Sequence, residues 1–183
     1  PATNPASDLE LKLPATIGTA GEVVQNSTTA GTLEMGSPFR PAFSAYCNAS
    51  YDIASNTDVK SLFQAEHFDT DNAYDATNAK FVVPANMGGA YQLNAAVGID
   101  DINDETKVNL KVKVNDSDTT GGYQQNSYSA GADRIASVNF NNVIKLSAGD
   151  EVKIFVRHNS TGTQSSENHM CYFSMFRLGG IAT

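Results

Sequence analysis

The sequence has no tryptophan and only two cysteines among its 183 residues. Charged residues are also scarce, at 17%, and only 12 of them are Lys or Arg, against 20 Asp or Glu. Two cysteines are too few for a disulfide-rich scaffold or a cysteine-rich metal site. The net charge of −8 argues against a nucleic acid or an anionic membrane as partner. No apolar run approaches the roughly 20 residues that span a bilayer, so we expect no membrane association.

Sequence signatures of catalysis are missing too, since no nucleophile elbow, zinc-protease, phosphate-loop or dinucleotide motif is found. The three histidines, His67, His158 and His169, share no metal-ligand spacing, and we expect them in exposed loops. Residues 69–75 begin like a calcium loop but lack its glycine and its bidentate glutamate. The acidic run at residues 100–105 is interpreted as a solvated hairpin end. The sequence therefore predicts no enzyme, no catalytic residue and no cofactor, with calcium left open.

The first 40 residues differ in composition and in hydrophobic pattern from the rest. Five of the six prolines lie there or at residue 41, and no apolar alternation is long enough for a core strand. We therefore expect an extended arm at residues 1–40 and one domain at residues 41–183. Short apolar groups along the arm would anchor it, because a plain linker has no use for them. The predicted anchoring residues are Leu9, Leu11, Leu13, Ile17, Val23, Val24, Leu33 and Met35.

Beyond the arm, apolar and polar residues alternate with the period of β-strands. The clearest case is residues 91–99, and residues 108–114 and 152–156 repeat the pattern. Gly121-Gly122 is interpreted as a loop between strands. We expect about eight to ten short strands and no helix, which indicates an all-β antiparallel sandwich or jelly roll.

The last predicted strand, residues 170–178, is apolar on both faces. Phe173 on one face alternates with Tyr172 and Phe176 on the other. Such a strand is buried on both sides, either centrally in a domain or at a subunit interface. Cys47 and Cys171 belong to no metal or redox motif. We expect two buried free thiols, with a disulfide as the alternative.

Segments of the domain resemble the globular head of complement C1q and the wider C1q/tumour-necrosis-factor-like jelly rolls. They are an opening P-A-F-S-A, a Y-D-x-x-T segment ending in V-P, a G-x-Y strand start, a G-D-x-V turn and a closing F-S-x-F strand. Met175 stands where the family has a small glycine in the closing strand. The matching segments are residues 41–46, 72–84, 89–91, 146–152 and 173–178.

The resemblance implies an antiparallel jelly roll whose first and last strands are neighbours, which would bring Cys47 and Cys171 close together. It also implies a tight homotrimer formed through one face of the sandwich. On this basis the expected residues of the trimer interface are Tyr91, Tyr172 and Phe176.

The arm carries a second resemblance. Residues 13–26 and 31–36 are similar to L-P-x-x-x-G-T-x-G-Q-V-L and G-x-L-x-W segments in structural proteins of tailed bacteriophages. An arm of this type on a C1q-like head resembles a virion decoration, cement or fibre protein. We therefore expect a homotrimeric capsid decoration protein on the virion surface, assembled in the host cytoplasm. Its partner would be the major capsid protein or another virion protein.

Two further functions stay open. One is a knob at a fibre tip, which would bind a receptor or a host surface glycan through loops such as residues 100–105 and 159–168. The other is a secreted C1q-like binding protein. The start of the sequence has neither a basic region nor an apolar stretch, so it shows no secretory leader and argues against secretion.

Overall fold

The computed structural model divides the chain into two compact units, Pro1–Arg40 and Pro41–Thr183, which we call the arm and the head. The division falls at the boundary that the proline content suggests. Three of the predicted anchoring residues, Leu9, Leu11 and Ile17, lie outside the part of the chain that the structure describes. The described residues are 12–15, 18, 22–26, 32–36, 41–103, 105–128 and 134–180.

The described part of the arm contains two short strands. Strands β1 (Val23–Asn26) and β2 (Leu33–Gly36) pair with each other in antiparallel fashion. A single bridge also joins Lys12 to Thr32. The backbone is extended, as expected, but it folds back into a hairpin that the sequence did not predict. Pairing satisfies those N–H and C=O groups of each strand that face the other strand, which an isolated extended chain leaves to water.

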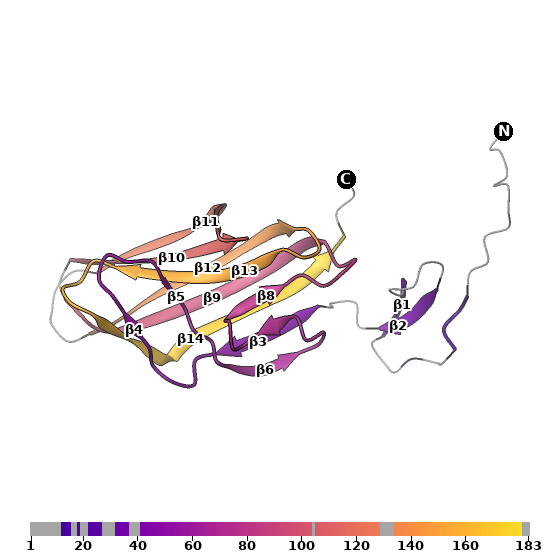
Figure 1. Cartoon of the computed structure of the whole chain (residues 1–183), viewed down its shortest axis with the longest axis horizontal. Coiled ribbons are helices and arrows are strands. Elements are labelled where there is room, and N and C mark those ends of the chain that lie inside the picture. Colours follow the sequence, from indigo (N-terminus) through magenta and orange to yellow (C-terminus); the bar gives the residue numbers. More distant parts are fainter. Residues whose placement is uncertain are drawn as a thin grey trace. The chain divides into compact units, whose positions relative to one another are not determined.

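The head is a jelly-roll sandwich of two antiparallel sheets that lie face to face (Figure 1). We call them the β9 sheet and the β10 sheet. The β9 sheet has the order β12 (Arg134–Leu146), β9 (Gly89–Ile102), β14 (Gln164–Gly179), β3 (Ala42–Tyr46), β6 (Ala65–Asp69), and β4 (Asp52–Ile53) pairs with β14. The β10 sheet has the order β11 (Ser117–Tyr128), β10 (Thr106–Val114), β13 (Glu151–His158), β8 (Lys80–Val82), β7 (Tyr74–Asp75), and β5 (Val59–Lys60) pairs with β13.

The strands follow the alternation seen in the sequence. In β10, Val108 and Leu110 are buried while Lys107 is exposed, and β13 alternates in the same way. The first and last strands of the head, β3 and β14, pair directly, which confirms the expected neighbourhood. No helix in the described part of the chain is long and apolar enough to span a bilayer.

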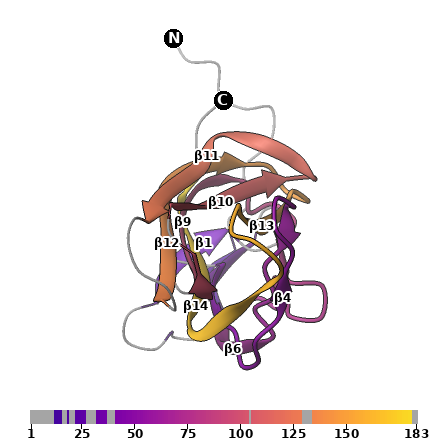
Figure 2. The same ribbon diagram turned by 90° about the vertical axis from the view of Figure 1, so that its left-hand side faces the viewer.

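Strand β11 was missed, and the loop predicted at Gly121-Gly122 is wrong. Both glycines lie within β11, which pairs with β10. A side chain at Gly122 would place its Cβ 2.9 Å from the Thr119 carbonyl oxygen, so the strand passes close to its own backbone there. The Asn126 side chain donates to the Ser137 carbonyl in β12 at 2.8 Å, which links the two sheets at this edge (Figure 2).

Two other predicted loops are shorter than expected. Strand β14 already begins at Gln164, inside the polar stretch 159–168. Strand β9 likewise continues to Ile102, into the acidic run that begins at Asp100. In β9 the polar side chains Asp100 and Asp101 are exposed, whereas in β14 Gln164 and Ser166 are buried, so polarity marks a loop in neither place.

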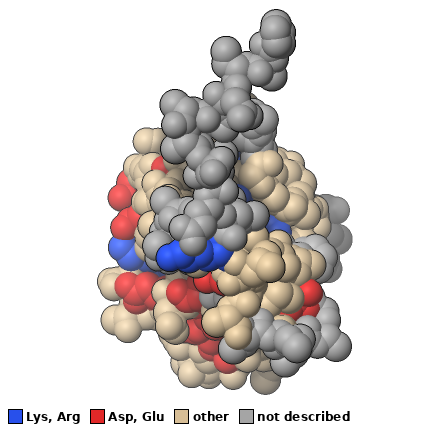
Figure 3. Space-filling view, turned by 90° about the vertical axis from the view of Figure 1, so that its right-hand side faces the viewer, with Lys and Arg blue, Asp and Glu red and all other residues tan. Residues whose placement is uncertain are grey.

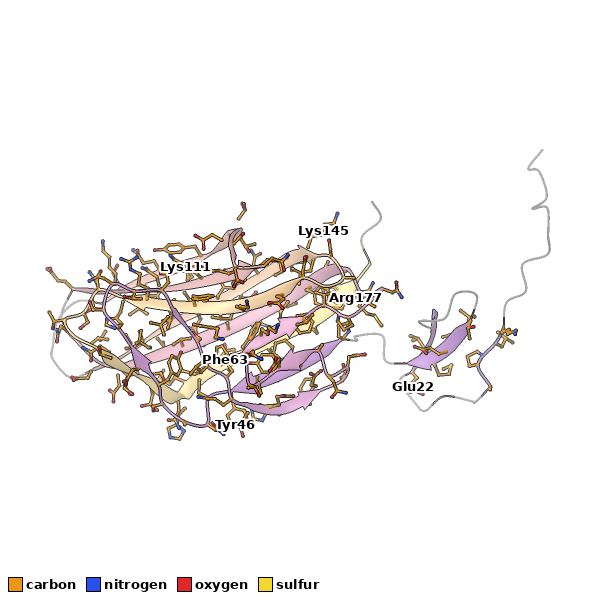
Figure 4. All side chains as sticks on the ribbon, viewed as in Figure 1. Glu22, Tyr46, Phe63, Lys111, Lys145 and Arg177 are labelled. Atoms are coloured by element: carbon orange, nitrogen blue, oxygen red, sulfur yellow. The ribbon has the colours of Figure 1, made fainter. Side chains whose placement is uncertain are left out.

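Aromatic rings fill the space between the sheets. Phe43 stacks on Tyr74 and Phe81, with ring centroids 4.6 and 5.1 Å apart, and meets Phe173 edge-on at 4.9 Å. Phe63 lies in the same layer, between the sheets (Figure 4). Full burial of one such side chain contributes about 1.5–3 kcal/mol, so this cluster holds the two sheets together.

Candidate functional site

Strand β14 shows only one of its two apolar faces to the core. Cys171, Phe173 and Met175 are buried between the sheets. Tyr172 points the other way and is 45% exposed, and Phe176 is half-buried on the same side. The strand is therefore not buried on both faces within one chain, and its outer face is left open.

The outer face of the β9 sheet carries three cross-strand rows of side chains from four strands. We call these rows the uncharged face, because none of their residues is charged at neutral pH. The rows are Asn139–Ala96–Tyr172–Tyr46, Asn141–Asn94–Ser174–Ser44 and Val143–Gln92–Phe176–Ala42.

The polar groups of this face are bonded to one another. The Gln92 side-chain amide donates to the side-chain oxygen Oδ1 of Asn141 at 2.9 Å, and the Asn141 side-chain amide donates to Oδ1 of Asn94 at 2.5 Å. Amides that satisfy each other in this way lose less on leaving water than unpaired ones. The centre of the face can therefore be covered by another surface at low cost.

The outer face of the β10 sheet is different, because it is covered by ion pairs. Lys80 contacts Glu151 at 2.5 Å, Lys111 contacts Asp58 at 2.6 Å, and Lys153 lies between Glu151 and Asp116. The hydrogen bonds that Lys80 and Lys153 donate hold the pKa of the Glu151 carboxyl below its usual value. This face is solvated, and burying its charges at an interface would carry a large desolvation penalty.

The exposed apolar side chains gather on one sheet. Among the described residues of the head, six of the seven large exposed hydrophobic side chains lie on strands of the β9 sheet. The exception is Tyr123, on β11 of the β10 sheet. The six are Phe68, Ile135, Val143, Met170, Tyr172 and Leu178.

A hollow of about 640 Å³ opens at one edge of the uncharged face. Tyr46 and Tyr172 line it, and the Tyr46 ring stacks on His67 with centroids 4.4 Å apart. Tyr46 lies on the outside of the sandwich (Figure 4). His169 also lines the hollow, so His67 and His169 border the same hollow although they are far apart in the sequence.

The predicted interface residues are divided between the two sides of the β9 sheet. Tyr172 and Phe176 lie on the uncharged face. Tyr91 instead points into the core, where it is fully buried and donates its hydroxyl hydrogen to the Met87 carbonyl at 2.6 Å. It offers no surface to a neighbouring chain, so the contact surface proposed below excludes Tyr91.

The described anchoring residues of the arm differ in exposure. Leu13 is 75% exposed, Val24 54% and Val23 43%. Leu33 and Met35 are half-buried within the arm. The arm therefore keeps apolar side chains available for contact, although nothing in its own geometry identifies the partner.

The histidine expectation is wrong for His158. Its side chain is fully buried, and its Nε2 atom lies 2.8 Å from the Ile53 carbonyl oxygen. The candidate calcium run has a structural role instead, because the Asp69 carboxylate accepts hydrogen bonds from the N–H groups of Asp71 and Tyr74. Within the described residues, no three His, Cys, Asp or Glu side chains are grouped as metal ligands.

Figure 3 shows acidic and basic side chains at one end of the molecule, with uncharged residues between them. The net charge of −8 disfavours binding to a nucleic acid.

Solved structures share this architecture. The globular domain of zebrafish complement 1qA matches with a TM-score of 0.54 and 16% identity, over 78% of this chain and 100% of that one. The head is a C1q/TNF-like jelly roll. Eiger TNF from S. frugiperda matches with a TM-score of 0.53 and 14% identity, over 80% of this chain and 96% of that one. Murine APRIL gives 0.54 and 16%, over 75% and 98%.

These likenesses concern the fold of the head. No protein-family model matches the sequence. No curated protein matches it either. At 14–16% identity the shared feature is the arrangement of strands, so the function of this jelly roll has to be argued from its own surface.

Proposed function

We propose that the chain is a homotrimeric structural protein of a virion surface, in which the uncharged face joins three heads and the arm attaches the trimer to the particle. The observation that carries the trimer is the uncharged face itself. Three rows with no charge, with paired amides and with the exposed side chains of Tyr172 and Val143 are suited to a protein neighbour. The number three rests on the resemblance of the head to C1q-like domains.

The role of the arm rests on its sequence and on its exposed apolar residues. Leu13, Val23 and Val24 are too few to bind tightly alone. Three arms on one trimer bind together, because each further contact becomes an intramolecular event. This geometry suits a capsid decoration or cement protein, with the major capsid protein as partner of the arms.

The first test is the solution mass of the purified full chain, measured by light scattering. The proposal expects three times the mass of one chain. A stable monomer at micromolar concentration would contradict it, and so would a stable dimer.

Two matched substitutions test which of the two sheets forms the contact between heads. Tyr172 and Tyr123 are similarly exposed, at 45% and 51%, but lie on opposite sheets. An unpaired charge buried at an interface costs about 3–5 kcal/mol, so Tyr172→Arg is expected to yield monomers. Tyr123→Arg is expected to leave the trimer intact. If Tyr123→Arg alone dissociates the trimer, the contact lies on the β10 sheet and the assignment fails.

Deletion of the arm distinguishes the cement role from that of a receptor-binding knob at a fibre tip. A head that lacks residues 1–36 is expected to stay trimeric and to lose binding to particles. If this head instead binds host cells or polysaccharide, the protein is a receptor-binding knob and the cement role is refuted.

A further inference from the structure

The fold places Cys47 and Cys171, the two cysteines of the chain, directly opposite each other. Cys47 follows β3, and Cys171 lies in β14. The register of these strands pairs Tyr172 with Tyr46, so the next position pairs Cys171 with Cys47. The Cys47 N–H donates to the Cys171 carbonyl oxygen at 3.3 Å, which confirms this continuation.

This placement matches what a disulfide requires. Opposite residues of an antiparallel pair have Cα atoms about 4.5–5.5 Å apart, and disulfides join Cα atoms about 4.4–6.8 Å apart. Opposite residues also project on the same side of the sheet, so both sulfurs meet on the inner side. The Cys47 thiol donates to the Leu62 carbonyl oxygen at 2.7 Å, and the Cys171 thiol donates to the Glu167 carbonyl oxygen at 3.1 Å. The two thiols lie close enough for each to shift the pKa of the other. No movement of the backbone is needed to bring them together.

A reagent reaches the sulfurs most easily while the head folds. In the folded head both cysteines are only 3% exposed and belong to the core between the sheets, although both residues border the hollow of about 640 Å³. Exchange with a reagent of low molecular weight is therefore expected during folding, before the core closes over the sulfurs.

The two thiols differ in acidity. The hydrogen bond with Cys171, together with burial, raises the pKa of the Cys47 thiol. The same hydrogen bond lowers the pKa of Cys171, whose thiolate it stabilises. Cys171 is therefore the better first nucleophile, because the thiolate is the reactive form of cysteine.

We propose that Cys47 and Cys171 form a redox site, which a low-molecular-weight disulfide such as oxidised glutathione closes to an intrachain disulfide. Cys171 loses its proton to solvent and its sulfur attacks oxidised glutathione, which releases one glutathione thiolate and leaves a mixed disulfide. Cys47 then loses its proton, and its sulfur attacks the Cys171 sulfur. The second glutathione leaves, so two electrons have passed from the two cysteines to the oxidant.

The bond would tie the first strand of the head to its last. Strand β3 directly follows the arm in the sequence, and β14 carries Tyr172 and Phe176 of the uncharged face. The link would also restrict the unfolded chain by closing a long loop. For a loop of this size, the unfolding equilibrium constant is expected to fall on the order of 10³-fold.

The test refolds the full chain from urea with a mixture of oxidised and reduced glutathione. The expected product has an intact mass about 2 Da below that of the reduced chain, from the loss of two hydrogens, and no thiol reactive with a maleimide under denaturing conditions. A digest should contain one peptide pair joined through Cys47 and Cys171. Addition of dithiothreitol should restore both thiols and lower the urea midpoint.

Cys47→Ala is the matched control, because it keeps Cys171 but cannot close the bond. This variant is expected to carry one glutathione after the same treatment. Its urea midpoint of unfolding should not change when dithiothreitol is added. The proposal is overturned if the full chain keeps two reactive thiols, or if it carries glutathione without forming the joined peptide. Because the deciding measurement uses the unaltered chain, poor folding of the control leaves the result valid. The solution mass tests the trimer separately, so either proposal can fail alone.

Discussion

Phe173 and Phe176 lie on opposite faces of β14, and truncating each to alanine is expected to affect different properties. Phe173 is fully buried and contacts three other rings, those of Phe43, Phe63 and Tyr74, at centroid distances of 4.9, 5.7 and 6.0 Å. A Phe→Ala change in a core costs about 3–5 kcal/mol. Because three aromatic contacts are lost together, Phe173→Ala is expected at the upper end of that range.

Phe176→Ala is expected to act on assembly instead. Phe176 is half-buried on the uncharged face, so its loss should cost one head about 1 kcal/mol or less. In a trimer the same change removes three contacts at once. We therefore expect weaker self-association, with a solution mass that falls on dilution while the secondary structure of the head is unchanged.

The assay combines urea unfolding with light scattering. Unfolding is followed by far-ultraviolet circular dichroism and tyrosine fluorescence, since the chain has no tryptophan. Both substitutions are also made in the Tyr172→Arg background, which is expected to keep the chain monomeric. There Phe173→Ala should lower the free energy of unfolding by at least about 3 kcal/mol, and Phe176→Ala by much less. Equal losses for the two would refute the assignment of the faces of β14.

Three further outcomes are expected. Deletion of residues 1–36 should leave the head trimeric by light scattering and abolish binding to particles in a sedimentation assay. Glu151→Gln should lower the melting temperature slightly at pH 7, and less as the pH falls. The Lys80 contact lowers the pKa of Glu151, so its stabilisation is present above the unfolded value of 4.5 and is lost on acidification. Gly89→Ala should strongly destabilise the head, because its Cβ would lie 2.1 Å from the Gly179 carbonyl oxygen.

The strands that the sequence predicts best are those whose side chains alternate strictly. Strand β10 alternates valine and leucine with lysine and asparagine, so its period alone identifies it. Strand β11 has no such signal, because only Tyr123 and Tyr128 are large apolar residues among polar ones. Its conformation is imposed by pairing with β10, from which only the turn Asn115–Asp116 separates it, and by a contact with β12. Both turn residues have positive φ, as in a two-residue hairpin, so the signal lies in the turn and not in an apolar alternation.

The candidate site was predicted in part. Two apolar faces on the last strand pointed to Tyr172 and Phe176, and both lie on the open side of the sheet. Tyr91 was assigned to the same side, but it shares the parity of Leu93, which lies in the core. Alternate residues of a strand share a face, so Tyr91 and Leu93 point into the core. Their neighbours Gln92 and Asn94 face outward. The hollow between His67 and His169 could not be predicted, since it depends on the pairing of β3, β6 and β14.

The two outer faces of the sandwich differ in charge: ion pairs cover the β10 sheet, and the β9 sheet carries uncharged rows. Solvation of a monomer alone does not explain this difference. Outward positions of β10 carry lysines, and Lys111 and Lys113 have acidic partners at Asp58 and Asp118. The corresponding positions of β9 carry Gln, Asn, Ala and Gly, and the amides of Gln92 and Asn94 are already hydrogen-bonded to Asn141. The charges that keep the β10 sheet solvated and bar it from other sheets are absent from the three rows of the uncharged face, although Lys145 lies in the next row. The proposed assembly explains the difference, because copies of the same chain would cover the uncharged face of the β9 sheet. The pair of substitutions Tyr172→Arg and Tyr123→Arg tests this directly.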